Sequence, residues 1–319
     1  MTINMDNYLL RIEKMKKSLT ILQKENFKIA SNGTHHKVYI SNKYVIRFRD
    51  DNQKILAREV KLLKQLNHPL IPRVLWSGYI NKSFVMLENR LPGKTLDLLW
   101  KILPKKNQLN IINQIIQFLQ YIKTQNYNYV YSVNTGKKYN NFKGYLTNNI
   151  KQKVASIKKI KQTNDILKEL ILVIKKPEVQ KFFSNQEKIT LVHGDLIIHN
   201  LLSDGKNLTG VIDWELALYG VPDYDLFRLF YYEECAKAYQ EQDTDESFEA
   251  EFLNMLNVKI LKSNLIKSKK KFQKKYQLVN AIFFLNALYW AVNSDNRNEN
   301  INELKMLWKK RSGVKYICT

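Results

Sequence analysis

The stretch Leu191–Glu215, LVHGDLIIHNLLSDGKNLTGVIDWE, decides the fold of this chain. Two apolar runs, 189–192 and 208–212, each end in polar side chains that a hydrophobic core would not require. Between the runs lies Asp204-Gly205, a strong signal for a hairpin turn because both residues tolerate a positive φ. The sequence therefore predicts a short hairpin with a polar open end.

The polar residues at this open end are His193, Gly194, Asp195, Asn200 and Asp213. Folding the chain back about Gly205 sets Asn200 opposite about residue 210 and brings Asp213 beside the loop that carries Asp195. Two carboxylates and a carboxamide suit Mg²⁺, which prefers oxygen ligands and is usually held by one or two carboxylates together with substrate phosphates. One carboxylate remains to orient an attacking hydroxyl and accept its proton, as in phosphoryl transfer. The alternative is a calcium-binding or merely solvated acidic turn.

The pattern H-G-D-x-x-x-x-N followed by I-D-W-E resembles the catalytic and metal-binding motifs of the aminoglycoside phosphotransferase and choline kinase superfamily, which is related to the protein kinases. This resemblance implies an α+β, bilobal, protein-kinase-like fold, with a small, mainly β amino-terminal lobe (1–90) and a larger, mainly helical carboxyl-terminal lobe (91–319). It also implies that Asp195 is the catalytic residue, that Asn200 and Asp213 hold Mg²⁺, and that ATP or GTP is the co-substrate. His193 supports the catalytic loop in that family, so we do not expect it to act as a proton shuttle.

Composition is that of a globular chain: 319 residues, 45% hydrophobic and 12% aromatic, enough for two lobes with a sizeable core. The formal charge of +23 suggests an anionic partner, but most of the excess is scattered lysine and only 267–275 is a dense basic run, so nucleic acid is not the expected partner. The two cysteines, Cys235 and Cys318, give no disulfide or metal spacing, which favours a reducing, cytoplasmic setting. The amino terminus shows no signal peptide, and the most apolar segment, 281–292, is too short to span a membrane, so we expect it to be a buried helix.

A leading helix is predicted to about residue 24, followed by a strand, turn, strand pattern over 27–40. The tip of this turn contains Ser31, Asn32, Gly33 and Thr34, and we expect it to close over the nucleotide. A single glycine makes this a weak phosphate-loop signal by itself.

The next strand, 43–48, places Arg47 among apolar residues, and the following helix, 53–66, places Glu59 on its apolar stripe. A carboxylate on a buried stripe requires a cation. In the resembling kinases a strand lysine pairs with a helix glutamate and contacts the nucleotide phosphates. Arg47 and Glu59 stand at those positions, with arginine in place of lysine. A purely structural ion pair is the alternative.

After Glu88 the chain changes character, and the loop Asn89–Gly93 resembles the hinge between kinase lobes, where the base lies against the backbone of the linking strand. We therefore place Glu88 among the nucleotide-binding residues. The sequence does not decide between adenine and guanine, because these contacts are made by the backbone.

The second lobe is predicted to be mostly helical, with an amphipathic helix over 109–122, a loop over 126–145, and helical patterns over 146–176 and before Gln186. Further helices follow near the carboxyl terminus. Asp225 matches the later aspartate of the family pattern and by resemblance braces the catalytic loop. Where the family has Gly-Asp-Pro, this chain has Gly220-Val221-Pro222. The sequence does not indicate what this change does.

Residues 233–251 are strongly acidic for so basic a chain, and we expect Glu233 and Glu234 to attract a small, cationic, hydroxyl-bearing substrate. An acidic, solvated helix is the alternative. The favoured function is phosphorylation of an aminoglycoside-type antibiotic, and the later part of the chain resembles the hygromycin phosphotransferase branch. A choline, ethanolamine or other metabolite kinase and a non-catalytic kinase-like nucleic-acid-binding protein are the alternatives.

Overall fold

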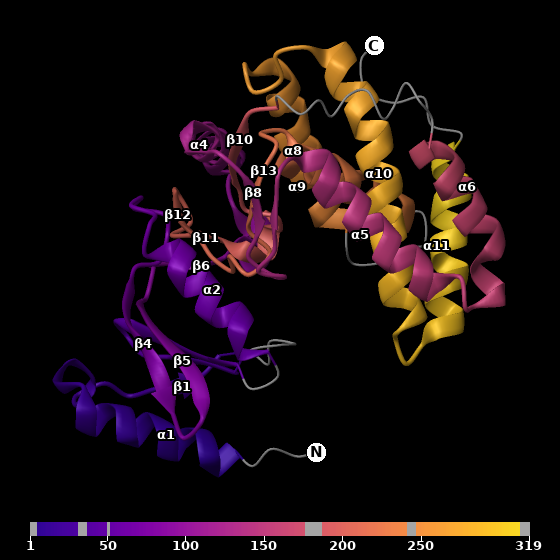
Figure 1. Ribbon diagram of the computed structural model, residues 1–319. Helices are drawn as coiled ribbons and strands as arrows, with labels where there is room; N and C mark the ends of the chain where they lie inside the picture. Colours follow the sequence, from indigo (N-terminus) through magenta and orange to yellow (C-terminus); the bar gives the residue numbers. More distant parts are fainter. Residues whose placement is uncertain (1–4, 31–36, 50–51, 176–186, 241–246, 313–319) are drawn as a thin grey trace.

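The strand that carries Arg47 lies at the centre of an antiparallel sheet. The computed structural model describes residues 5–30, 37–49, 52–175, 187–240 and 247–312. The order is β1-β2-β3-β5-β4. The bounds are β1 Lys28–Ile29, β2 Lys37–Ile40, β3 Tyr44–Arg49, β4 Val74–Ile80 and β5 Ser83–Asn89. Helix α1 (Met5–Ser18) and helix α2 (Gln53–Leu63) lie on opposite sides of this sheet (Figure 1).

Alternation along β3 and β5 sorts the side chains of the sheet onto its two faces. Ile46, Phe48, Val85 and Leu87 pack with the core of α1, whereas Met86 packs with the core of α2. Arg47 is paired in register with Met86 and therefore faces α2. This period of two is the reason why a cation in an apolar strand meets a carboxylate of the neighbouring helix.

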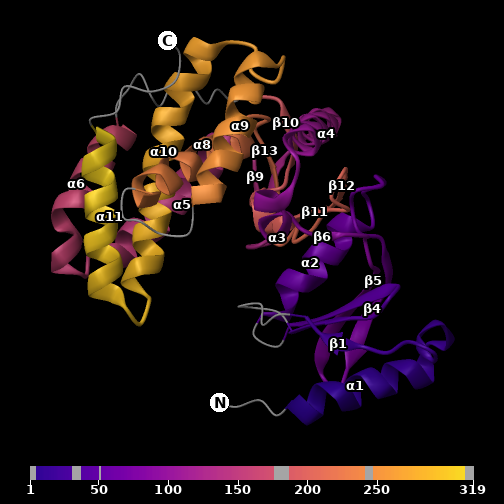
Figure 2. The ribbon, with the colours of Figure 1, turned by 180° about the vertical axis from the view of Figure 1, so that it is seen from behind.

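The second lobe contains two smaller sheets and most of the helices (Figures 1 and 2). One sheet has the order β7-β10-β13-β8-β9 and the other has the order β12-β11-β6. The strand bounds are β6 Lys94–Thr95, β7 Asn126–Tyr127, β8 Val130–Ser132, β9 Lys138–Tyr139, β10 Ile189–Val192, β11 Leu201–Ser203, β12 Leu208–Val211 and β13 Leu218–Gly220. Since β5 ends at Asn89 and β6 already pairs with β11, we propose the lobe boundary at about Arg90.

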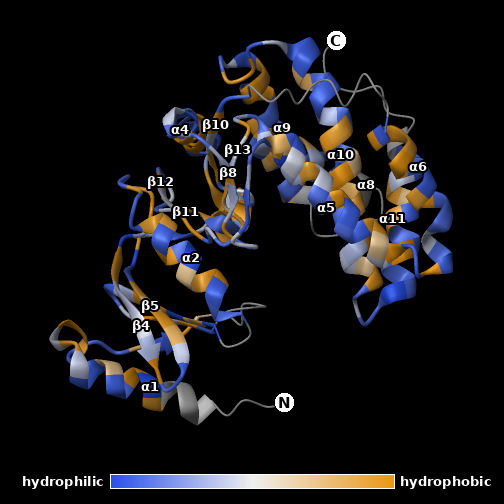
Figure 3. Cartoon of the chain, viewed as in Figure 1, coloured by the Kyte–Doolittle hydropathy of each residue, from blue (hydrophilic) through white to orange (hydrophobic). Residues whose placement is uncertain are grey.

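The helices of the second lobe gather around α10 (Lys269–Val292), the predicted buried helix, which contacts α5, α6, α8 and α11. Because neighbours cover it on several sides, apolar residues occur around much of its circumference (Figure 3). Among the described residues, no helix is both long and apolar enough to cross a membrane. The other bounds are α3 Leu96–Leu99, α4 Lys105–Thr124, α5 Phe142–Ile157, α6 Asn164–Lys175, α8 Tyr224–Gln240, α9 Ser247–Lys262 and α11 Arg297–Ser312, with short 3₁₀ turns η1 Thr20–Leu22, η2 Trp100–Ile102, η3 Lys161–Thr163 and η4 Ile198–Asn200.

The α+β, two-lobed fold is confirmed, but the prediction of a loop over 126–145 is wrong. This segment contributes β7, β8 and β9, and α5 begins at Phe142. The strands are two or three residues long, too short to show a period, and they form because β10 and β13 lie between them in the sheet. Tyr127 stacks on Tyr219 of β13 at 3.6 Å between ring centroids, a contact that local sequence does not reveal.

The predicted hairpin is present as β11 and β12, and Gly205 has the expected positive φ of 92°. The predicted register was wrong by about two residues, since Gly210 pairs with Leu202 and the amide of Ile212 donates to the carbonyl of Asn200. An irregularity between Leu202 and Ser203 shifts the pairing. The shift brings Asp213 immediately beside Asn200.

Trp214 shows how strongly packing holds this region. Its side chain is fully buried, its Nε1 donates to the carbonyl of Val211 at 3.0 Å, and its ring lies edge-on to His193 and Phe118. We expect Trp214→Ala to lower the free energy of unfolding by about 3–5 kcal/mol. Trp290→Ala, at a tryptophan that is 65% exposed, should change it by less than about 0.5 kcal/mol.

Urea unfolding followed by far-ultraviolet circular dichroism checks this prediction without relying on tryptophan emission. Equal losses of stability in the two variants would contradict it.

Candidate active site

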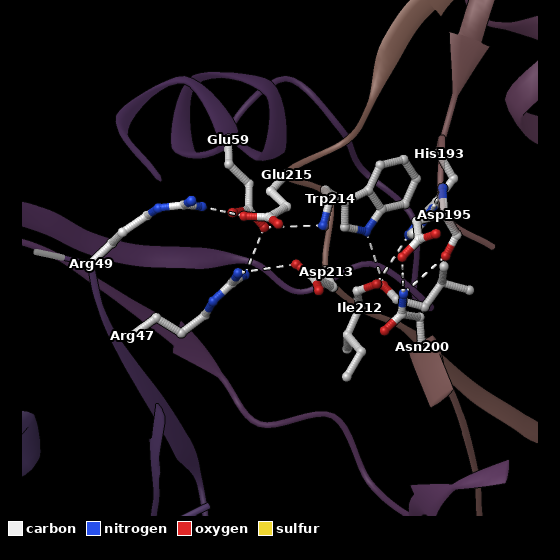
Figure 4. Close-up of polar contacts among 11 residues, drawn as sticks. Arg47, Arg49, Glu59, His193, Asp195, Asn200, Ile212, Asp213, Trp214 and Glu215 are labelled. Carbon is white, nitrogen blue, oxygen red and sulfur yellow. Dashed lines mark hydrogen bonds and ion pairs between the residues drawn. The ribbon is translucent and has the colours of Figure 1, made fainter. Parts of the chain in front are cut away.

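An ion pair between the central strand of the first sheet and helix α2 forms one wall of the site. Arg47 Nη1 on β3 donates to Glu59 Oε1 on α2 at 2.6 Å, and the Glu59 side chain is completely buried (Figure 4). The same carboxylate oxygen accepts the backbone amide of Trp214 at 3.1 Å. Glu59 therefore connects the first lobe to the segment that follows the hairpin.

Two arginines of β3 reach the same segment. Arg47 Nη2 lies 3.3 Å from Asp213 Oδ1, and Arg49 forms an ion pair with Glu215 (Figure 4). Burial acts to lower the pKa of Arg47, but the carboxylates of Glu59, Asp213 and Glu88 outweigh it and raise that pKa. Arg47 thus stays charged and connects a helix carboxylate with the predicted metal ligand.

His193 links the catalytic loop to the end of β12. Its Nδ1 accepts the backbone amide of Asp195 at 3.2 Å, and its Nε2 lies 3.0 Å from the carbonyl oxygen of Ile212. An accepting Nδ1 requires the proton to be on Nε2, which then donates to that carbonyl. The ring is hydrogen-bonded on both sides and joins the loop to the strand end, the geometry of a supporting residue.

The loop turns at Gly194, whose φ of +83° is in the left-handed region. A Cβ atom there would lie 2.1 Å from the carbonyl oxygen of Leu216, so the position requires glycine. Asp225, at the start of α8, accepts the backbone amides of His193 and Gly194, each at 2.8 Å. Burial raises the pKa of the Asp225 carboxyl, while the two amides act in the opposite direction. The expected bracing geometry is present.

Asp195 is held by three side chains. Asn200 Nδ2 donates to its backbone carbonyl at 2.9 Å and to Oδ2 at 3.3 Å, while Arg228 Nη2 and Tyr232 Oη donate to Oδ1 at 3.1 and 2.8 Å. Arg228 also donates to Tyr232 Oη. A partly exposed carboxylate thus has a fixed orientation.

Our sequence reasoning missed Arg228 and Tyr232. A signal existed, because Asp225, Arg228 and Tyr232 are three, four and seven residues apart and therefore lie on one face of α8. Burial acts to lower the pKa of Arg228, yet Tyr232 and Asp195 outweigh it and raise that pKa. Burial raises the pKa of Tyr232 to about 12, so its hydroxyl remains a donor.

The donor set fits a divalent cation that arrives with a phosphate-bearing ligand. Asn200 directs its nitrogen to Asp195, which leaves its amide oxygen for another ligand, and Asp213 lies at the adjacent strand end. In the described parts of the chain, no group of three or more His, Cys, Asp or Glu side chains could hold a metal alone. Mg²⁺ favours this arrangement, in which phosphate oxygens and water complete a coordination shell begun by one carboxylate and one carboxamide.

Asp213 adopts a φ of +65°, which a non-glycine residue rarely takes. Aspartate is among the residues that tolerate this left-handed conformation, because its short polar side chain can bond locally. Here the turn directs the carboxylate toward Arg47 and not along the strand (Figure 4).

The other predicted site residues fall into three groups. Ser31, Asn32, Gly33 and Thr34 lie outside the described residues. Glu88 is buried on β5 near Arg47, and burial raises its pKa to about 7, opposed by Arg47. Glu233 and Glu234 are on α8.

The carboxylates of Glu233 and Glu234 are engaged within the helical lobe. Glu233 is buried, accepts Asn257 Nδ2 at 2.6 Å and forms an ion pair with Lys237, while Glu234 accepts Asn280 Nδ2 at 3.1 Å. Glu249, in the same acidic stretch, instead lies beside the catalytic loop, where it contacts His199 at 2.8 Å.

With this geometry established, comparison with known proteins identifies the family. A sequence model described as "Phosphotransferase enzyme family" matches residues 26–254, more than two thirds of the chain. The chain belongs to this family. It is therefore a phosphotransferase, and the resemblance inferred from the H-G-D and I-D-W-E motifs is confirmed.

Solved structures show the same fold. A thermostable mutant of aminoglycoside phosphotransferase APH(4)-Ia, in complex with AMP-PNP and hygromycin B, has a TM-score of 0.65 at 15% identity, covering 92% of this chain and 98% of its own. The gentamicin complex of APH(2'')-IIa has a TM-score of 0.57 at 20% identity, covering 98% and 96%. None of the curated proteins compared with the chain matches it in sequence. At these identities the structural likeness shows the fold.

His199 lies between two carboxylates directly before Asn200. Its Nδ1 is 3.2 Å from Asp97 Oδ2, and its Nε2 is 2.8 Å from Glu249 Oε1. The hydrogen bond that the imidazole donates to Glu249 raises the pKa of His199, against partial burial, with Asp97 adding to the rise. The imidazole thus connects α3 to α9.

We expect the stabilisation from His199 to be fully present below pH 6.5, the ordinary pKa of histidine, and to be lost as the pH rises through its higher folded-state value. Because the side chain is half exposed, the effect is less than about 1 kcal/mol. The difference in unfolding free energy between the natural chain and His199→Gln, measured from pH 5.5 to 8.5, should shrink with rising pH. His68→Gln serves as the control. Burial lowers the pKa of His68, so the difference for this variant should not shrink with rising pH. A difference that grows with pH would contradict the assignment.

Proposed function

We propose that this phosphotransferase is a small-molecule kinase that transfers the γ-phosphate of ATP or GTP to a hydroxyl of a small cationic acceptor. An aminoglycoside-type antibiotic is the first candidate, and the cytoplasm is the proposed location. One observation carries the proposal: Asp195 is fixed by Asn200, Arg228 and Tyr232, while Asp213 lies across from it on an independent support. The two carboxylates are thus given different environments and different tasks.

In this proposal, Asp195 acts on the hydroxyl of the acceptor. Its ion pair with Arg228 fixes the carboxylate in one orientation. Positioning of this kind suffices, because the transition state of phosphoryl transfer is loose and catalysis depends mainly on positioning and charge stabilisation. Oδ1 is held by α8, so the less constrained Oδ2 orients the incoming hydroxyl and accepts its proton.

Asn200 and Asp213 would hold Mg²⁺ through their side-chain oxygens. When bound, the cation supplies charge neutralisation between the β- and γ-phosphates. Arg47 is positioned to contact phosphate with Nη2 while Nη1 stays on Glu59. Ser31, Asn32, Gly33 and Thr34, together with Glu88, remain proposed parts of the nucleotide site.

We propose Glu249, in place of Glu233 and Glu234, as the carboxylate that attracts a cationic acceptor. The first two carboxylates are held by Asn257 and Asn280, whereas Glu249 lies next to the catalytic loop. The likeness to structures solved in complex with hygromycin B, gentamicin and streptomycin supports an aminoglycoside-type acceptor. An amino-alcohol kinase uses the same catalytic residues and is the second candidate.

A coupled assay of nucleoside diphosphate release tests the proposal with ATP and GTP against aminoglycosides, choline, ethanolamine and sugars. We expect acceptor-dependent, Mg²⁺-dependent turnover in the natural chain. Asp195→Asn should lower kcat by about 10²–10⁴-fold with nucleotide binding retained, because only the base is lost. Asp204→Asn, the same change at the exposed tip of the same hairpin, should leave kcat unchanged.

Full turnover in Asp195→Asn would disprove the role of this residue. Absence of turnover with every acceptor, combined with salt-sensitive binding of single- or double-stranded nucleic acid, would favour the non-catalytic alternative.

A further inference from the structure

Helix α2 contacts the second lobe through Arg58 as well as through Glu59. Arg58 Nε donates to the carbonyl oxygen of Val133 at 2.5 Å, and Nη2 of the same side chain donates to the carbonyl oxygen of Asn134. Val133 and Asn134 lie in the turn between β8 and β9. Because the guanidinium is a rigid, planar group, two hydrogen bonds to consecutive carbonyls fix both the distance and the orientation of the helix relative to the turn.

The turn between β8 and β9 is itself held by several hydrogen bonds. The amide of Gly136 donates to the carbonyl of Ser132 at 2.7 Å, and the amide of Thr135 donates to Ser132 Oγ at 3.3 Å. The amide of Val133 donates to the carbonyl of Ala217 at 3.0 Å, and β8 pairs with β13. The turn is therefore a fixed support and not a free loop.

Further hydrogen bonds lead back to α2 through the segment that follows the hairpin. The amide of Ala217 donates to the carbonyl of Trp214 at 3.0 Å, and the amide of Trp214 donates to Glu59 Oε1 at 3.1 Å. Glu59 follows Arg58 directly in α2, so a closed series of contacts joins the helix, the turn and the segment after the proposed metal ligand. Helix α2 also packs on β4 and β5. Its placement therefore sets the placement of the sheet that carries Arg47.

Gly136 makes room for the side chain of Arg58. Its φ of +71° lies in the left-handed region, and a Cβ atom there would lie 2.9 Å from Cδ of Arg58 and 3.0 Å from its Nη1. The end of an arginine side chain is flexible, so a methyl group at residue 136 would displace the guanidinium from the two carbonyls. The glycine thus serves both the backbone conformation of the turn and the approach of the arginine.

We propose that Arg58 is a positioning residue for nucleotide binding: it holds α2 on the turn between β8 and β9, in the arrangement in which Arg47 faces Asp213. The inference rests on the proposed kinase function and extends it to a residue that acts through α2. Because both partners of Arg58 belong to the chain itself, the nucleotide does not have to supply the free energy that orders the site. When the contact is lost, only the fraction of molecules with α2 in place binds nucleotide, and the apparent affinity falls by that fraction.

Substitution of Arg58 tests the inference by the separation of KM from kcat. Arg58→Gln should raise the Kd for Mg²⁺·AMP-PNP, measured by titration calorimetry, and the KM for Mg²⁺·ATP by about tenfold, the size of a lost charged hydrogen bond. Saturating nucleotide restores the placement of α2, so kcat should change by less than about twofold. Arg58→Lys keeps the charge and should recover part of the affinity.

Lys61→Gln is the matched control, because it removes a positive charge from an exposed position of the same helix. It should change neither Kd nor kcat. Unchanged nucleotide affinity in Arg58→Gln overturns the inference. A fall in kcat with KM unchanged also overturns it, because loss of folded enzyme alone gives that result.

A double-mutant cycle tests the contact between Gly136 and Arg58. Gly136→Ala should raise the Kd for Mg²⁺·AMP-PNP by about tenfold, but by less than about twofold when Arg58 is already replaced by glutamine. Gly205→Ala is the control, since that glycine also has a positive φ but its Cβ would lie 3.9 Å from Cδ2 of Leu103, an ordinary contact. This variant should bind nucleotide normally. Equal effects of Gly136→Ala in both backgrounds overturn the inference.

Hydrogen exchange of the nucleotide-free chain separates failure of this inference from failure of the proposed function. In Arg58→Gln the amides of Val133, Trp214 and Ala217 should exchange at least about fivefold faster, while those of α10 should not change. Unchanged exchange together with unchanged nucleotide affinity overturns the inference, and acceptor phosphorylation by the natural chain then leaves the kinase function standing. Faster exchange combined with no nucleotide binding by the natural chain overturns the proposed function, and with it the role of Arg58 in nucleotide binding.

Discussion

The buried carboxylate of Glu59 is the constraint on which the rest of the site depends. A carboxylate removed from water is tolerated only with partners, and loss of one partner of a buried ion pair costs about 3–5 kcal/mol. Its partners are Arg47 on β3 and the backbone amide of Trp214 beyond β12. Satisfying one charge therefore fixes a strand, a helix and the segment from the other lobe in one arrangement (Figure 4).

The opposite side of the site is fixed by hydrogen bonds to the backbone of the loop that carries Asp195. His193 joins the amide of Asp195 to the carbonyl of Ile212, and Asp225 accepts two amides of the catalytic loop. Ile212, Asp213 and Trp214 are consecutive, so the histidine support, the predicted metal ligand and the Glu59 contact occur on three successive residues. Asp195 and Asp213 are thereby positioned by separate supports that meet at one strand end, which is how two carboxylates can take different roles.

The parts of this arrangement that follow a local pattern could be predicted from the sequence. The Asp-Gly turn between apolar runs gave the hairpin, and a glutamate on an apolar helix stripe implied the cation that Arg47 provides. What depends on distant packing was missed: the short tyrosine-rich strands need β10 and β13 as partners, and a bulge moved the register of the hairpin. Arg228 and Tyr232 were missed although they share a helix face with Asp225. Glu233 had the expected charge, but the sequence does not show that α9 buries it.

The binding of ATP with and without Mg²⁺ to Glu59→Gln, measured by titration calorimetry, tests the central claim most directly. Glu59 is expected to touch neither ligand, and glutamine keeps an acceptor for Trp214 while removing the charge opposite Arg47. The account predicts a loss of Mg²⁺·ATP affinity of about tenfold or more, the size of a lost charged hydrogen bond, approaching the loss in Asp213→Ala. Glu187→Gln, at an ion pair with Lys275 in the other lobe, is the matched control and should bind normally. Unchanged Mg²⁺·ATP affinity in a folded Glu59→Gln variant would contradict the account.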